Sequence, residues 1–206
     1  MLFAGGGLLS PAPPDFDSSA QEVVAFFTED RTRIHVSSAL LVVAMPFMIW
    51  FLAAVGSAAR PAGESATRAA NVALASGSVA VGVFLTDVAA LLVGALRPEN
   101  MAASPELAQA LHDYSWVAPA ASAPMFAAML AAFAVMSLRD GAVWPRRLGW
   151  AAAVAAVAYM LRTGAVFTDD GPFAADGVLG FVVPIVALLG WILAASVTLW
   201  LAGRRA

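Results

Sequence analysis

The stretch NVALASGSVAVGVFLTDVAALLVGAL, from Asn71 to Leu96, decides the fold of this 206-residue chain. It is an apolar run long enough to cross a bilayer, because about 20 apolar residues in a helix span a hydrocarbon core of ~30 Å. One ionisable residue, Asp87, lies well inside it. A charge near the bilayer centre costs about 2.5–3.5 kcal/mol on insertion scales, so we expect Asp87 to have a partner.

The composition places the rest of the chain in the same class of protein. Hydrophobic residues make up 61% of the sequence and charged residues only 12%. A soluble domain has about 45–50% apolar and about 25% charged residues, so this chain could not cover a soluble surface with polar groups. We therefore predict an all-α polytopic membrane helix bundle that forms a single domain with the lipid bilayer around it.

The residue types that are absent exclude several kinds of chemistry. The chain has no cysteine, which excludes disulfides, thiol catalysis, Cys-ligated zinc, iron–sulfur clusters and covalently attached haem. All 11 basic residues are arginine, so a lysine Schiff base, and with it a retinal pigment or a pyridoxal enzyme, is excluded. The sequence contains no Gly-rich phosphate loop, no G-x-S-x-G motif and no basic aromatic surface. We therefore expect no cofactor and no nucleic-acid partner.

Five segments have the length and apolarity of transmembrane helices. Residues 1–18 are expected to form a loose tail and residues 19–206 the membrane domain. Ser19 and Glu22 have the spacing of a capping box, which predicts a short interfacial helix before the first span, or an extension of that span. Ser104, Pro105 and Glu106 predict a second short helix before the third span, which Pro124 should bend. The predicted spans are about 34–55, 71–96, 116–136, 148–167 and 177–201.

The distribution of charge predicts the orientation. Threading five spans puts most arginines on one side of the membrane and most acids on the other. By the positive-inside rule the arginine-rich side is cytoplasmic, so the N-terminus is expected outside and the C-terminus inside a bacterial cytoplasmic membrane. The arginines on the predicted inner side are Arg60, Arg68, Arg139, Arg146, Arg147, Arg204 and Arg205.

Asp87 and Arg162 are expected at the same depth. Counted from the inner ends of their spans, both lie ~21–22 Å from the cytoplasmic boundary. A functional interpretation makes them a proton- or anion-responsive site open to the outer face, with Tyr159 and Thr86 as hydrogen-bonding neighbours. A structural interpretation makes them a buried ion pair between two spans, or lets Arg162 extend to the outer headgroups. The structural interpretation is favoured, because a lone Asp/Arg pair specifies no chemistry.

Small residues recur every four positions on the second span. This stripe lets a neighbouring helix approach closely, and the alanine-rich fourth span is the expected partner. A homodimer contact through the stripe is the alternative. Its residues are Ser78, Gly82, Thr86, Ala90 and Gly94.

The two histidines, His35 and His112, both map to the predicted outer boundary. A metal site built from them and Asp113 would need ligands brought together from distant segments, and no H-x-x-x-H or H-E-x-x-H spacing is present. We therefore predict no metal and interpret both histidines as interfacial residues bonded to water and headgroups.

Three segments resemble one family of proteins. They are VVAFFTEDRTRIHVSSALLVVAMPFMIWFLAAV from Val23 to Val55, WPRRLGWAAAVAAV from Trp144 to Val157 and SPELAQALHDYSW from Ser104 to Trp116. Together they are similar to small polytopic membrane proteins of high-GC bacteria that have no established function. The resemblance implies a multi-span helical fold and supplies no catalytic residues.

Three functions remain open from the sequence. The leading hypothesis is a non-enzymatic membrane component, either a partner subunit or a binder of a small apolar or anionic ligand in an outward-facing crevice. The second is translocation of ions or protons through an oligomer that uses Asp87 and Arg162. The third is a membrane-embedded enzyme for a lipid or terpenoid, with Asp87 as general acid.

Overall fold

A computed structural model describes residues 9–139, 144–168 and 171–203 of the chain, and within these ranges the structure is helical and contains no strand. The predicted all-α class is therefore confirmed. The longer helices are α2 (Ala20–Glu29), α3 (Arg31–Ala59), α4 (Glu64–Leu96), α5 (Pro98–Ala103), α6 (Pro105–Ala121), α7 (Ala123–Leu138), α8 (Arg146–Arg162) and α9 (Val183–Gly203). Shorter turns are η1 (Arg60–Ala62), η2 (Thr163–Val166) and the π-helical η3 (Val178–Val182).

The chain is a membrane protein with five helical segments that are long and apolar enough to cross a bilayer. This confirms the predicted number of spans. The first three helical segments run further than the predicted spans, because their polar end turns stay helical. The five segments are Arg31–Ala62, Glu64–Leu96, Pro105–Leu138, Arg146–Val166 and Val178–Thr198.

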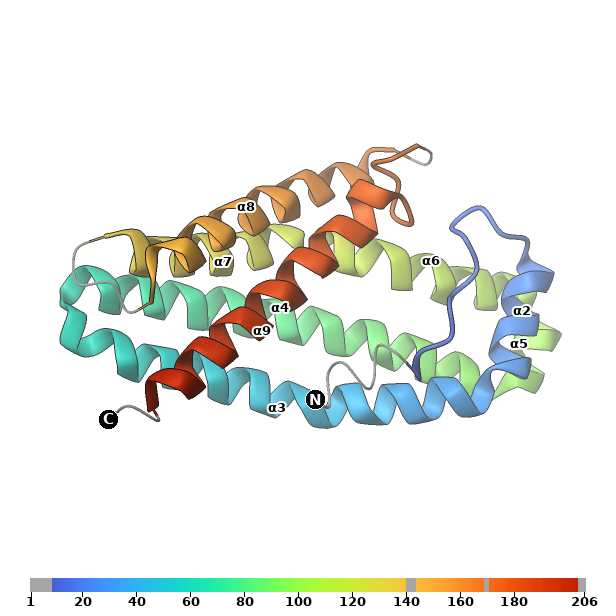
Figure 1. The fold of residues 1–206 in the computed structure, drawn as a ribbon. Helices are drawn as coiled ribbons and strands as arrows, with labels where there is room; N and C mark the ends of the chain where they lie inside the picture. The colour runs from blue at the N-terminus through green and yellow to red at the C-terminus, as the bar shows by residue number, and fades with distance from the viewer. Residues whose placement is uncertain (1–8, 140–143, 169–170, 204–206) are drawn as a thin grey trace.

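The long helices lie side by side (Figure 1). Helix α4 packs against α3 on one side and against α6 and α7 on the other. Helix α8 packs along α7, and α9, drawn in red, crosses the bundle diagonally and packs on α8. The main core lies among these helices. It contains a cluster of three aromatic side chains, Phe133, Trp144 and Trp191. The Phe133 and Trp191 rings stack with their centroids 4.4 Å apart, and the Trp144 ring packs edge-on against both.

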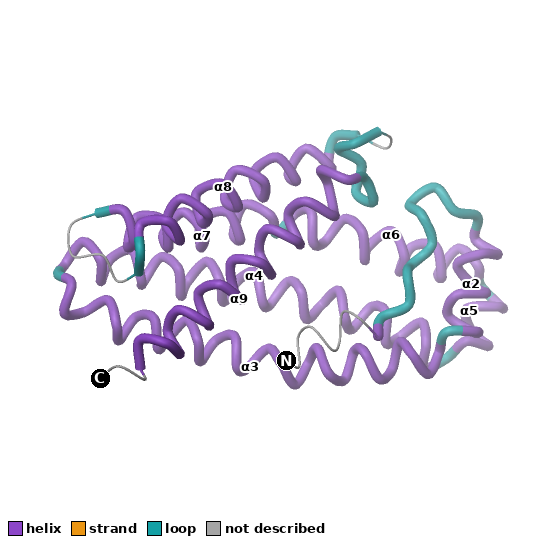
Figure 2. Tube along the Cα trace, in the orientation of Figure 1, coloured by secondary structure: helices purple, strands orange, loops and turns teal. Residues whose placement is uncertain are grey.

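One end of the bundle carries a second, smaller core. Here α2 and α5 pack with the first turns of α3 and α6 and the last turns of α4; we call this region the cap, and the opposite end of the bundle the arginine end (Figure 2). Helix α4 has 33 residues, a length of ~50 Å, which exceeds a hydrocarbon core of ~30 Å. The helix is therefore longer than a lipid crossing requires, and its last turns pack in the cap. The buried residues of the cap core are Val23, Phe26, Phe27, Ile34, Ala95, Met101 and Ala108.

Two local sequence predictions are confirmed in the cap and the third span. Ser19 and Glu22 form the capping box that begins α2, with the Ser19 N–H and hydroxyl each 2.8 Å from the Glu22 carboxylate. The third span breaks at Ser122, between α6 and α7. Pro124 causes this break, because it has no N–H for the Ala120 carbonyl and its ring crowds that carbonyl.

The segment that begins at Ser104 differs from its prediction. It was expected to be a short separate helix, but it continues as α6 through Trp116 to Ala121. The short helix before it is the six-residue α5. Nothing between Pro105 and Pro119 interrupts the backbone hydrogen bonds of a helix, so the interfacial turns and the span form one element.

Residues 9–19, which we call the strap, do not behave as the loose tail expected from their sequence. Pro11 is buried, and the strap bonds to distant parts of the chain at Pro14 and Phe16. No local pattern predicts these bonds, because the partners lie about a hundred residues or more away in the chain. The first eight residues of the expected tail lie outside the described part of the chain.

The small-residue stripe on α4 does not pack against α8. Gly82 and Thr86 are exposed, and only its cap-end members, Ala90 and Gly94, are buried. Helix α4 meets α7 instead through a neighbouring face, where Gly77 lies against the side chains of Leu52 and Met129. The predicted pairing of the second and fourth spans is therefore wrong, because α7 lies between them.

Candidate functional site

A buried polar layer lies between the two cores. On α4 the main core extends to Leu74 and the cap core begins at Leu91, and Asp87 lies between them. On the third span the cap core ends at Leu111 and the main core begins at Ala123, and His112 lies between them. Polar side chains therefore occupy the same level on two adjacent helices, at the base of the cap.

Asp87 is 7% exposed, and its Oδ1 atom is buried without a hydrogen-bond partner. The groups that act on its carboxyl are the Ser115 hydroxyl on α6 and, electrostatically, the Arg162 guanidinium. Asp87 lies ~34 Å of helical rise beyond Glu64, the first residue of α4. Asp87 therefore lies closer to the cap end of α4 than to its arginine end.

Arg162 is the last residue of α8 and is 3% exposed. Its guanidinium lies over the Phe181 ring of η3, with 5.5 Å from the guanidinium carbon to the ring centroid. Its Nε atom is buried and has no hydrogen-bond partner within the described ranges. The ring offers the cation a favourable electrostatic face, but it provides no acceptor for the Nε hydrogen, which lies in the plane of the guanidinium.

Asp87 and Arg162 do not form the direct ion pair that their equal depth predicted. The salt bridges found among the described residues are Arg33–Asp30, Arg68–Glu64 and the contact of His112 with Asp113. The two groups still interact electrostatically, which supports the same level for both. They interact from different helices without forming a salt bridge.

The two neighbours expected to hydrogen-bond to this pair have other partners. The Tyr159 ring packs on Phe126 at a centroid distance of 5.0 Å, and its contribution to Arg162 is electrostatic. Thr86 lies on the exposed side of α4 and shares a hydrogen bond of 2.7 Å with the Tyr114 hydroxyl. Thr86 thus joins α4 to α6 at the level of Asp87 but faces away from it.

His112 is 1% exposed and belongs to the same layer. Its Nε2 atom lies 3.0 Å from the Pro14 carbonyl oxygen of the strap, and Nε1 of Trp116 lies 3.3 Å from the same oxygen. Its Nδ1 atom lies 3.6 Å from Asp113, whose carboxylate also accepts a hydrogen bond from Gln109. His112 is therefore an attachment point for the strap and not a residue that faces headgroups.

His35 does not join this arrangement. It lies in the first turns of α3, and its Nε2 atom is buried without a partner. In the described part of the chain, no three His, Asp or Glu side chains gather closely enough to hold a metal ion. His35, His112 and Asp113 are thus not brought together as ligands.

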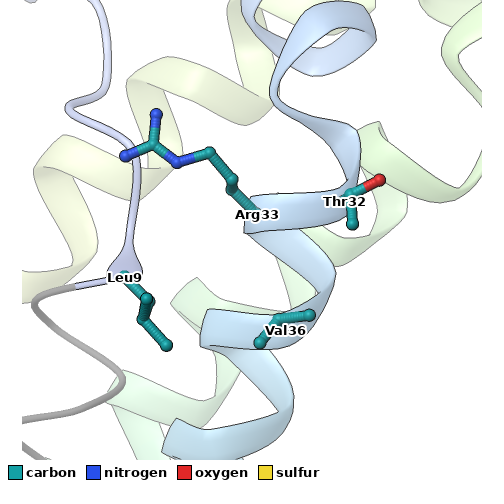
Figure 3. Close-up of a pocket in the computed structure, with 4 residues that line it drawn as sticks. All are labelled: Leu9, Thr32, Arg33 and Val36. Carbon is teal, nitrogen blue, oxygen red and sulfur yellow. The ribbon is translucent and has the colours of Figure 1, made fainter.

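Two grooves on the surface lie apart from the polar layer. The first, with a volume of about 200 Å³, runs between the strap and the start of α3 and is lined by Leu9, Thr32, Arg33 and Val36 (Figure 3). The second, of about 330 Å³, is an apolar furrow between α7 and α8. Neither groove is lined by Asp87 or Arg162.

The structure adds residues to the site that the sequence did not single out. Ser115 faces Asp87, Phe181 covers Arg162, and Trp116 meets the Phe181 ring edge-on at 5.3 Å. The spacing of His112 and Trp116, one helical turn apart, was a signal that both share a face. No signal could have found Phe181, because its contact depends on how η3 folds back toward α6 and α8.

Comparison with known proteins leaves the site to be interpreted from its own chemistry. No protein-family model, no curated protein and no solved structure matches the chain significantly. The resemblance to small membrane proteins of high-GC bacteria therefore stays a prediction. What the arrangement offers is a buried cation and a buried carboxyl, each with a buried polar atom that has no hydrogen-bond partner among the described residues.

Proposed function

We propose that this protein lies in a bacterial cytoplasmic membrane with the cap and the strap outside and the arginine end inside. The support is the distribution of charge on the folded chain. Arg60, Arg68, Arg139, Arg146 and Arg147 lie at the arginine end, whereas the cap carries most of the acids. Arginine-rich connections are retained in the cytoplasm during insertion, and this favours the proposed direction.

In this setting the protein acts as a non-enzymatic binder of an anionic group at the outer face, with Arg162 as the group that holds the anion. The proposal depends on the burial of Arg162 without a polar partner. Its side chain is 3% exposed, and among the described residues it has no ion pair and no hydrogen-bond acceptor for Nε. A buried cation without a partner is costly, and an anion would remove that cost. A carboxylate or phosphate fits, because the planar guanidinium can donate two parallel hydrogen bonds to either.

The depth of the site indicates where the anion comes from. Asp87 and Arg162 lie near the outer boundary of the bilayer, next to Trp116 and Tyr114, which are the residue types found at that boundary. Headgroup phosphates of the outer leaflet and small anions from the aqueous phase both reach this level. They offer the same chemistry to Arg162, and experiment must separate them.

The test uses purified protein in a neutral detergent. Dioleoylphosphatidylglycerol, dioleoylphosphatidylcholine and inorganic phosphate are added separately, and the thermal unfolding midpoint is followed. We expect one anionic probe to raise the unfolding midpoint and phosphatidylcholine to leave it unchanged. A rise with phosphatidylglycerol alone indicates a lipid headgroup, and a rise with phosphate indicates a soluble anion.

Two variants and a control make the test specific. Arg162→Gln should abolish the rise, whereas Asp87→Asn should retain or strengthen it, because it removes a nearby negative charge. Arg97→Gln is the matched control, since Arg97 is an exposed arginine in the cap. Equal anion responses in the wild type and Arg162→Gln, or loss of the response only in Arg97→Gln, would refute the assignment.

A second function, proton translocation, is favoured by one observation. Asp87 Oδ1 is buried in a span without a hydrogen-bond partner, as a carboxyl that gains and loses a proton would be. Liposomes that contain the wild-type protein should then show a flux driven by a pH gradient, and Asp87→Asn should remove it. No flux with either protein would end this alternative.

A further inference from the structure

The strap is attached at two points that belong to different parts of the fold. Its Pro14 carbonyl oxygen meets the ring nitrogens of His112 and Trp116 on α6. Two residues later the Phe16 N–H donates to the Asp176 carboxylate, at 3.2 Å, just before η3. In Figure 1 this segment, in dark blue, passes across α6.

The attachment at Pro14 involves the ring nitrogens of Trp116 and His112. A carbonyl oxygen can only accept, and it has two lone pairs. Nε1 of Trp116 always carries a hydrogen, and it lies 3.3 Å from the Pro14 oxygen and 3.1 Å from Nε2 of His112. Nε2 of His112 donates to Pro14 in one tautomer and accepts from Trp116 in the other. The indole N–H is therefore the fixed donor at this attachment, and the His112 ring completes it.

The two attachment points are tied to the elements that cover Arg162. Trp116 lies on α6, and its ring packs edge-on against Phe181 of η3, the ring that lies under the guanidinium. Asp176 lies in the turn that leads into η3. The strap thus links α6 to the η3 turn, the two elements whose Trp116 and Phe181 rings pack together next to Arg162.

Besides these hydrogen bonds, the strap is held by the burial of Pro11. It has little regular structure of its own, and Asp15 and Asp17 are exposed. Its prolines, Pro11, Pro13 and Pro14, restrict the backbone, so that little conformational entropy is lost when it is held in place. Such a segment can leave and return as a unit when a few hydrogen bonds break.

We propose that the strap, residues 9–19, is a lid that closes the outer entrance to the Arg162 site by joining Pro14 to His112 and Trp116 and Phe16 to Asp176. The inference rests on the proposed function, since it assigns the lid to that site. Closure keeps water and competing anions from Arg162. Release of either attachment separates α6 from the η3 turn and admits the anion between the Trp116 and Phe181 rings.

The test measures access to the site without any ligand. The chain has no cysteine, so Ser115→Cys, next to Asp87, provides a single reactive thiol. Its reaction rate with a water-soluble methanethiosulfonate is measured in detergent. Two further changes each release one attachment: His112→Phe removes one donor to Pro14, and Asp176→Ala removes the acceptor of the Phe16 N–H.

The expected result is an increase in the labelling rate of about five-fold in each release variant, the change expected for loss of one hydrogen bond that holds a local opening closed. Glu106→Gln, a change at an exposed carboxylate of α6, should leave the rate unchanged. If His112→Phe fails to fold, Asp176→Ala decides the result, because Asp176 lies outside the helices. Equal rates in the parent and Asp176→Ala, or fast labelling of the parent, would refute the lid.

The outcomes separate this inference from the proposed function. A lid without anion binding gives faster labelling in the release variants and no thermal response to phosphatidylglycerol or phosphate. Anion binding without a lid gives the thermal response and unchanged labelling. When both hold, the anionic probe that raises the unfolding midpoint should also bind and dissociate faster in Asp176→Ala.

Discussion

Gly94 of α4 lies directly against the ring of Phe27 of α2, so closely that a Cβ atom on Gly94 would overlap the ring. Phe27 is fully buried in the cap core. The approach of α2 to the end of α4 therefore depends on the absence of a side chain at one position, and the cap is packed as tightly as the main core.

This contact predicts opposite effects for the same substitution at two glycines of α4. Gly94→Ala should destabilise the protein by about 1–3 kcal/mol, because Phe27 must move in a packed core. Gly82→Ala should stabilise it by about 0.5–1 kcal/mol, because nothing lies within 4 Å of a Cβ atom there and alanine favours the helix. Unfolding in detergent measures both. A gain at Gly94 would contradict the packing described for the cap.

The separation of Asp87 and Arg162 predicts a weak coupling between them. Alanine substitutions at both sites, alone and together, should give a coupling free energy of about 0.5–1 kcal/mol, because the groups interact without forming an ion pair. The same cycle with Arg97 in place of Arg162 should be additive. Strict additivity for Asp87 and Arg162 would show that they do not interact, and a coupling of several kcal/mol would show a direct ion pair.

The capping box predicts a pH dependence at the start of α2. The backbone N–H and the hydroxyl of Ser19 both donate to Glu22 and hold the pKa of its carboxyl below the ordinary value. A lowered folded-state pKa means that the stabilisation is fully present above the ordinary glutamate pKa and is lost as the pH falls through the lower, folded-state value. Amide exchange at the first turn of α2 should accelerate over that pH range.

Glu22→Gln is the control for this effect. The glutamine side chain can still accept from the Ser19 N–H but has no acid to titrate. Its amide exchange should show no step in the same range of pH. A step of equal size in both proteins would mean that another group controls the end of α2.

The Trp191 side chain of α9 should contribute to the free energy of unfolding, because it bonds to α8. Its N–H donates to the Leu148 carbonyl oxygen of α8 at 3.0 Å, inside the main core. Trp191→Phe keeps the stacking on Phe133 but removes this donor and part of the ring, and should destabilise the protein by about 1–3 kcal/mol. Trp150→Phe is the matched control, since Trp150 is 65% exposed, and it should change the unfolding free energy by less than about 0.5 kcal/mol.

The sequence correctly predicts the structural elements that are determined by residues close together in the chain. The five spans follow from long apolar runs, the start of α2 from Ser19 and Glu22, and the break in the third span from Pro124. The common depth of Asp87 and Arg162 stays a prediction from counting along two helices, and their electrostatic interaction agrees with it. None of these inferences needs to know which helix lies beside which.

The inferences that failed all concern lateral arrangement. The stripe from Ser78 to Gly94 was assigned to α8, but α7 lies between the two helices. Asp87 and Arg162 were paired because their heights agree, yet depth does not fix the direction in which a side chain points around its helix. The bonds of Pro14 and Phe16 join strap and bundle over long separations in sequence, so no local pattern in the sequence could predict them.

The cap core imposes an order on biogenesis. It combines α2 and the first turn of α3 with the last turns of α4 and the first turns of α6, so α2 leaves the ribosome some eighty residues before its last packing partner. Until α6 has been synthesised, Phe26 and Phe27 cannot be enclosed. The nascent chain must therefore carry these aromatic side chains uncovered, or resting in the lipid headgroups, while the first two hydrophobic segments are inserted.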